Sequence, residues 1–176
     1  VYTKQAVFSS GGRPFTLIDT PGHTDFAPEM ERCLQALDYA VLVVSAAEGV
    51  QAHTETIWHL LERYEIPTLL FLNKTDRPGV DKAASLLELQ RKLSPLCFLA
   101  EKDGDGLSSK AVEDLAGLHE TLVNRYLEGE TTLQEWTSIA AEYTQKRLCF
   151  PCFWGSALEG TGISELLWGL ASLAPL

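Results

Sequence analysis

The stretch "TLLFLNKTD", residues 68–76, decides the fold, because a continuous apolar run passes directly into four polar residues. A run without polar alternation is typical of a strand that is covered on both faces in a parallel sheet. A second such run, "AVLVV", occupies residues 40–44. Between the two runs, apolar side chains recur at helical spacing at Ile57, Leu60, Leu61 and Tyr64. The order of strand, helix and strand predicts a parallel βαβ unit.

The same alternation continues on the C-terminal side of this unit. A helix is predicted by the apolar spacing of Ala83, Leu86 and Leu87. Residues 148–153 predict another strand, and the helix after it has its apolar side chains at Ile163, Leu166, Leu167 and Leu170. The predicted fold class is therefore α/β, with a doubly wound and mostly parallel sheet.

An N-terminal antiparallel hairpin is predicted before the parallel part. Residues 2–8 and 15–18 have the pattern of strands, and the "SSGG" of residues 9–12 joins them. The two glycines of this segment can take the positive φ angles of a tight turn. A helix is expected after residue 26, with Pro28 in its first turn, where a missing N–H removes no hydrogen bond.

Residues 95–147 break this rhythm and are interpreted as a helical insertion within one domain that spans residues 1–176. Two helices are expected there, with apolar stripes at Leu115, Leu118, Leu122 and Tyr126, and at Leu133, Trp136, Ala140 and Tyr143. Thr132 and Glu135 have the spacing of a capping box at the start of the second helix.

The composition excludes several classes of partner. The chain of 176 residues carries a formal net charge of −10, which argues against sequence-specific DNA binding, because phosphate contacts need clustered Lys and Arg. No apolar run approaches the roughly 20 residues of a membrane span, so no membrane partner is expected. A cytoplasmic protein with its four cysteines reduced is the simplest interpretation.

Polar residues that follow apolar strands are the first candidates for a site, because ligands of open α/β sheets bind outside the carboxyl ends of the strands. The first group is Asp19, Thr20, Pro21, Gly22 and His23. The Asp19 carboxylate could hold Mg²⁺ through water, and the Gly22 N–H could donate to a phosphate oxygen. His23 could orient a water molecule, which makes it the candidate catalytic residue.

The second group is Asn73, Lys74 and Asp76, after the strand of residues 68–72. Guanine presents N1–H and N2–H₂ side by side, so one carboxylate at Asp76 can accept both, whereas adenine offers no such pair of donors. Lys74 can lay its aliphatic stem over the purine face. Asn73 can either tie the loop together or reach the base.

The third group is Ser156, Ala157 and Leu158, after the last predicted strand. A backbone N–H near Ala157 could donate to the guanine O6. The three strand ends would then surround one nucleotide.

These three groups, "DTPGH", "NKTD" and "SA", resemble the third, fourth and fifth motifs of the translational GTPases, in the same order and at suitable spacing. A given pentapeptide occurs by chance about once in several million positions, so the combination is specific. The resemblance spans essentially the whole chain. Within the class, the chain is most similar to elongation factor G and to the ribosomal-protection tetracycline-resistance proteins, for example in "EMERCLQALDYAVLVVSAAEGVQAHTETIWHLLERYEIPTLLFLNKTDRPGV".

The resemblance implies a P-loop GTPase-like fold, GTP or GDP and Mg²⁺ as ligands, and the ribosome as partner of the intact protein. It implies Mg²⁺ and γ-phosphate sensing at Asp19 and Gly22, and water positioning at His23. Base recognition is implied at Asn73, Lys74, Asp76, Ser156 and Ala157. The expected function is that of the guanine-nucleotide domain of a protein that hydrolyses GTP to GDP and phosphate.

One element of such a GTPase is missing from the sequence, because no G-x-x-x-x-G-K-[ST] segment occurs in it. By the resemblance, the strand that feeds this loop would lie between the strand before Asp19 and the strand of residues 40–44. We therefore expect the chain to be a piece of a longer protein, with negligible hydrolysis alone. The gap would otherwise be closed by repacking, by strand exchange or dimerisation, or by a partner.

Other interpretations remain open beside this one. The chain could be a non-catalytic module that docks to the ribosome or to sister domains, or part of a translational GTPase of the release-factor or back-translocase type. Cys149 and Cys152 have redox-motif spacing, but they lie on a predicted strand, so packing is favoured. His53 and His59 point in different directions from one helix, which argues against a metal site.

Overall fold

The structure is a computed structural model that describes residues 4–20 and 27–175. Its strands are β1 (Lys4–Ser10), β2 (Arg13–Asp19), β3 (Ala40–Ser45), β4 (Thr68–Asn73), β5 (Cys97–Leu99), β6 (Lys102–Asp103), β7 (Gly106–Leu107) and β8 (Phe150–Trp154). Its helices are α1 (Ala27–Leu34), α2 (Ala52–Arg63), α3 (Lys82–Lys92), α4 (Ser109–Ala116), α5 (Glu120–Glu128), α6 (Leu133–Gln145) and α7 (Ile163–Leu173).

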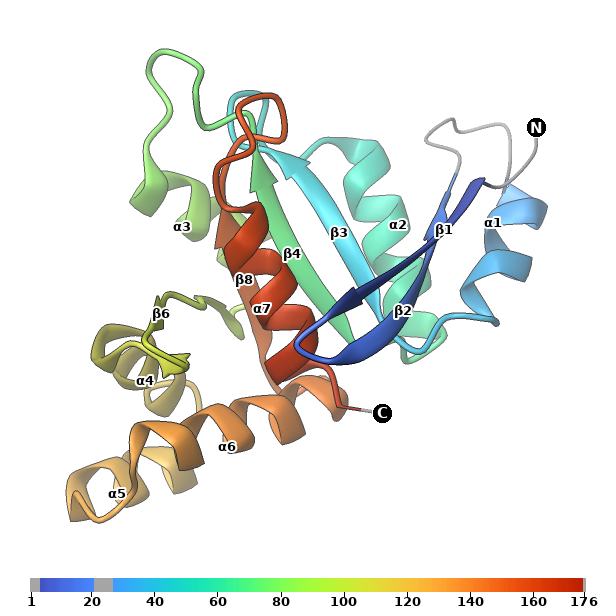
Figure 1. The fold of residues 1–176 in the computed structure, drawn as a ribbon. Coiled ribbons are helices and arrows are strands. Elements are labelled where there is room, and N and C mark those ends of the chain that lie inside the picture. The colour runs from blue at the N-terminus through green and yellow to red at the C-terminus, as the bar shows by residue number, and fades with distance from the viewer. Residues whose placement is uncertain (1–3, 21–26, 176) are drawn as a thin grey trace.

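The main sheet has four parallel strands in the order β3-β4-β8-β5 (Figure 1). Both continuous apolar runs are adjacent strands of this sheet, with Leu42 paired to Leu70, which confirms the predicted βαβ unit. The run in β4 lacks alternation because both of its faces are covered. Leu69 and Leu70, which point to opposite faces, are both 0% exposed.

Two apolar cores lie on opposite faces of the sheet, as a doubly wound fold requires. On one face, Leu42 and Leu70 pack with Trp58 and Leu61 of α2, and α1 and α3 complete this layer. On the other face, residues of β4 and β8 pack with α4, α6 and α7, and Figure 1 shows α7 and α2 on opposite sides of the strands. The predicted fold class is therefore confirmed.

The N-terminal hairpin forms as predicted, and both strands extend closer to the turn than the predicted ranges of residues 2–8 and 15–18. Ser10 pairs with Arg13, so Gly11 and Gly12 alone make the turn, with φ angles of +56° and +76°. In the part of the chain that the structure describes, this hairpin is a sheet of its own and β3 is an edge strand of the main sheet. The hairpin is held against α7, where the Arg13 guanidinium donates to the Ala171 and Ala174 carbonyls at 2.8 and 2.9 Å.

The segment of residues 95–147 contains more elements than the two helices expected there. The first apolar stripe is divided between α4 and α5, because the chain turns after Ala116 and both shorter helices pack on the same core. Cys97–Leu99 forms β5, which pairs with β8 and extends the main sheet. The predicted capping box is present at the start of α6, where Thr132 N–H donates to Glu135 Oε2 at 2.7 Å and Glu135 N–H donates to Thr132 Oγ1 at 3.2 Å.

The two cysteines near β8 are buried in the core, which explains why they are spaced like a redox motif without being one. Cys149 is fully buried, and desolvation raises its pKa to about 12, so it remains a thiol at neutral pH. Cys152 lies in β8 and is buried as well, which confirms that this pair of cysteines packs in the core. None of the helices among the described residues is long and apolar enough to cross a membrane.

Candidate functional site

The carboxyl ends of β3, β4 and β8 lie next to one another at one edge of the main sheet. Ser45 pairs with Asn73, and the Ala46 N–H donates to the Asn73 carbonyl at 2.8 Å. On the other side of β4, the Gly155 N–H donates to the Leu72 carbonyl at 3.0 Å. The second and third predicted groups are therefore brought together, at the position where α/β sheets bind ligands.

Asn73 joins the two loops through a single side-chain oxygen. Its Oδ1 accepts the N–H of the next residue, Lys74, at 2.8 Å. The same oxygen accepts the N–H of Ala157, which is 84 positions further along the chain, at 2.9 Å. Of the two roles considered for Asn73, the structure contains the tie between loops. The Ala157 N–H, which was expected to face a guanine O6, donates to Asn73 in this structure.

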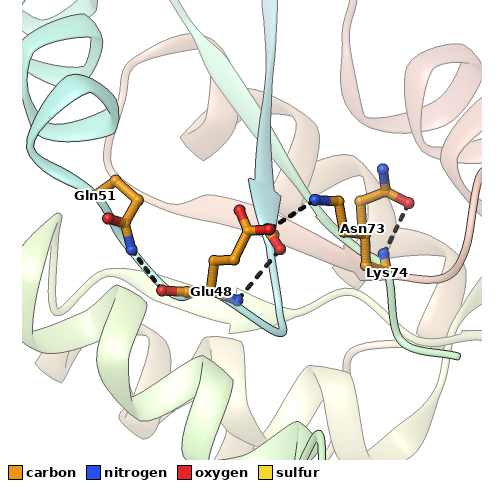
Figure 2. A network of polar contacts seen from close by, with 5 residues as sticks. Glu48, Gln51, Asn73 and Lys74 are labelled. Carbon is orange, nitrogen blue, oxygen red and sulfur yellow. Dashed lines mark hydrogen bonds and ion pairs between the residues drawn. The ribbon is translucent and has the colours of Figure 1, made fainter. Parts of the chain in front are cut away.

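Lys74 has an unusual backbone and a fixed side chain. Its φ angle is +63°, a left-handed conformation that few residues other than glycine adopt and that is common at functional sites. The Lys74 ammonium donates to Glu48 Oε1 at 2.9 Å, and Figure 2 shows this contact beside the hydrogen bond that the Lys74 N–H donates to Asn73. Both ends of the residue are therefore held.

Asp76 is exposed and is oriented by a buried neighbour. A hydrogen bond from the Ser156 side chain is the main reason that the pKa of Asp76 is lowered, and the Arg77 charge adds to it. Ser156 itself is only 1% exposed, so its position is set by packing. The carboxylate is thus ionised at neutral pH and can accept two hydrogen bonds from a ligand.

The loop after β8 is closed by Thr161. The Ser156 N–H donates to both the Thr161 carbonyl and Oγ1, each at 3.0 Å. The two sides of the loop approach so closely that a Cβ on Gly155 would lie 2.1 Å from the Thr161 carbonyl oxygen, so only glycine fits there. This closure fixes the position of Ala157. Leu158, in the same loop, is 86% exposed.

Asp19, which opens the first predicted group, lies on a different sheet from this edge in the described part of the chain. Asp19 ends β2 and is exposed, and β2 belongs to the separate hairpin sheet. Thr20 follows it, whereas Pro21, Gly22 and His23 lie outside the described residues. The structure thus assembles the Asn73 and Ser156 loops with each other and leaves Asp19 on a different sheet.

The candidate site residues chosen from the sequence did not include Glu48 or Thr161, although both help to order the loops at this edge of the sheet. Glu48 lies three residues after the end of β3, so the rule applied to the other strand ends would have included it. Thr161 lies between Gly160 and Gly162, both of which have positive φ angles, and this pattern of glycines after a strand was the signal for a tight loop.

Comparisons with known proteins agree with this geometry. The family model described as the elongation factor Tu GTP binding domain matches residues 1–176. An oxytetracycline resistance protein from Streptomyces rimosus is 38% identical over 90% of this chain and 27% of its own length. The tetracycline resistance protein TetM from Streptomyces lividans is 36% identical over 97% of this chain and 28% of its own length.

A solved structure of similar fold supports the same family assignment. A crystal structure of a protein from Thermus thermophilus superposes with a TM-score of 0.80 at 27% identity, over 98% of this chain and 32% of that one. The chain spans little more than a quarter of the length of the resistance proteins that it matches. Because the family model matches residues 1–176, the chain belongs to the elongation factor Tu GTP-binding domain family.

Proposed function

We propose that the loops after β4 and β8 bind the base of a guanine nucleotide. Asp76 accepts the N1–H and N2–H₂ donors of guanine, and the stems of Lys74 and the exposed Leu158 contact the faces of the ring. The observation that carries this proposal is the assembly of an ionised, Ser156-held carboxylate beside loops already tied through Asn73. The Ala157 N–H would then be shared between Asn73 Oδ1 and the guanine O6.

We further propose that the protein to which this chain belongs hydrolyses GTP at the ribosome. The similarity to tetracycline-resistance proteins of Streptomyces supports this assignment. His23 would position the attacking water, and the Gly22 N–H would contact the γ-phosphate. Asp19 fits Mg²⁺, since it is an exposed carboxylate at a strand end, and the ion when bound would neutralise phosphate charge.

The test is isothermal titration of the chain with GDP, GTP and ATP in the presence of Mg²⁺. We expect heats of binding for GDP and GTP and none for ATP, because adenine would leave the Asp76 carboxylate without donors. Equal binding of ATP, or no binding of any nucleotide, would contradict the proposal. An interaction module without a nucleotide site predicts the latter result.

Asp76→Asn gives a sharper prediction about the base. Xanthine has an oxygen where guanine has its N2 amine, so an amide side chain can accept from N1–H and donate to that oxygen. The variant should bind GDP about tenfold more weakly and should bind xanthosine diphosphate better than the wild type does. Asp114→Asn, which changes a carboxylate on α4 paired with Lys110, is the matched control and should bind GDP normally.

A further inference from the structure

The side chain of Lys74 is held by an acidic residue from a third loop. Glu48 lies between β3 and α2, and its Oε1 accepts from Lys74 Nζ at 2.9 Å (Figure 2). The side chains are 60% and 42% exposed, so the pair lies at the rim of the sheet edge rather than in the core. A rim position leaves the stem of Lys74 accessible to a ligand.

The loop that carries Glu48 is itself fixed at both ends. The Glu48 N–H donates to Ser45 Oγ at 3.2 Å, and its carbonyl accepts from Gln51 Nε2 at 2.5 Å. Further along, Glu88 of α3 accepts the Val50 N–H at 3.0 Å. The Glu48 carboxylate is therefore presented from an ordered loop, and the hydrogen bond from Lys74 is the main reason that its pKa is lowered.

We propose that Glu48 is a positioning residue of the guanine-base site, which holds the Lys74 side chain where its stem forms one wall of the base slot. This inference rests on the proposed function. With the backbone N–H of Lys74 bonded to Asn73 and its ammonium bonded to Glu48, the four-carbon stem is held at both ends. A long side chain that is ordered before the ligand arrives loses less conformational entropy on binding.

The pairing also directs the charge of Lys74 toward Glu48. An unpaired lysine ammonium is free to fold back toward Asp76, and it would then compete with the guanine donors for that carboxylate. Glu48 therefore acts in two ways, by ordering the stem and by keeping the ammonium engaged away from Asp76. Both effects operate through Lys74 and predict that Glu48 has no influence of its own on the base.

The test is a double-mutant cycle on GDP affinity, measured by isothermal titration of the chain. Glu48→Gln removes the charge with little change in shape, and we expect its Kd for GDP to rise about two- to fivefold, as is typical for an exposed ion pair. Glu48→Gln should have no further effect in a Lys74→Ala background, because the residue through which it acts is gone. Glu142→Gln, on α6, removes a similarly exposed pair with Lys146 at the end of that helix and should leave the Kd unchanged.

Each outcome separates the two proposals. GDP binding by the wild type with an unchanged or tighter Kd for Glu48→Gln would overturn the role of Glu48 and leave the base site standing. An equal loss in the Lys74→Ala background would also overturn it, since Glu48 would then act by another route. Absence of GDP binding by the wild type would overturn the base site and, with it, this inference. Thermal unfolding of every variant should match the wild type, which excludes a general loss of fold.

Discussion

Asn73 shows how one side chain can join segments that are distant in the sequence. Its amide oxygen has two lone pairs, so it accepts from the next residue in its own loop and from Ala157 in the loop after β8. A carboxylate at this position would add a negative charge beside Asp76, and an aliphatic side chain would leave both N–H groups without this acceptor. The amide is thus the side chain that ties the loops without changing the charge of the site.

Cys149 gives a prediction about pH. Its pKa is raised from 9.0 to about 12 by burial, so the unfolded chain releases the thiol proton at lower pH than the folded chain. Stability linked to this group is present below pH 9 and is lost as the pH rises toward 12. Between these values, the free energy of unfolding should fall by about 1.4 kcal/mol per pH unit on account of Cys149 alone.

Urea unfolding at about pH 8 and about pH 10 measures this dependence. Because other groups can also contribute to the pH dependence, the quantity to compare is the slope of the wild type against that of Cys149→Ala. The variant should be less stable at both pH values, since it leaves a cavity, but its stability should fall less between them. Equal slopes for the two proteins would show that Cys149 does not titrate as its burial requires.

At the scale of elements, the contact between the hairpin and α7 joins the two ends of the chain. The turn approaches the helix so closely that a Cβ on Gly11 would lie 2.8 Å from the Ala171 Cβ. Ser10 Oγ donates to the Leu167 carbonyl at 3.3 Å, and Arg13 donates to two carbonyls near the end of the helix. A guanidinium at a helix C-terminus is favoured, because the unpaired carbonyls there carry partial negative charge.

Arg13→Ala should therefore release the hairpin from α7. The loss of two charge-assisted hydrogen bonds is expected to cost about 2 kcal/mol locally. Hydrogen exchange of the β1 and β2 amides, followed by mass spectrometry, should become faster in this variant while the amides of β4 remain protected. Gln5→Ala, in an exposed part of β1, is the control and should exchange like the wild type. Unchanged exchange in Arg13→Ala would mean that other contacts hold the hairpin.

At the scale of the whole molecule, the described part of the chain leaves β3 as an edge strand and exposes apolar side chains on β3 and on the hairpin. Val43 is 57% exposed although it lies on a strand, and Val7 and Leu17 on the hairpin are 78% and 52% exposed. The free N–H and C=O groups of an edge strand are a template for pairing with another chain. We expect the chain to self-associate as its concentration rises.

Val43→Lys should suppress this association, because a charged side chain on an edge strand cannot be buried against a second copy. Sedimentation velocity over a range of concentrations should show a smaller rise in average mass for the variant. Leu87→Lys makes the same change at a residue of similar exposure, 54%, on helix α3 and should associate like the wild type. An equal effect of both variants would assign the association to net charge rather than to the edge of the sheet.

The apolar runs of β3 and β4 and the helical spacing between them were sufficient to predict the parallel unit. Burial on both faces holds for β4 but not for β3, where Val43 is 57% exposed because β3 is an edge strand of the described sheet. The proposed base-binding residues Asn73, Lys74 and Asp76 could be chosen as candidates from the sequence, since they stand at or directly after the end of β4. The split of the expected helix into α4 and α5 was not predictable from its stripe, because both short helices present apolar residues to one core.

What the sequence determined by itself is local: where the strands of the parallel unit and of the hairpin lie, and which polar residues stand at their ends. What only the tertiary structure decided is which of these ends meet. The bond from Ala157 to Asn73, the pairing of Glu48 with Lys74 and the seat of the hairpin on α7 all join residues far apart in the chain. Such contacts depend on the order of strands in the sheet, and that order follows from the packing of the whole core.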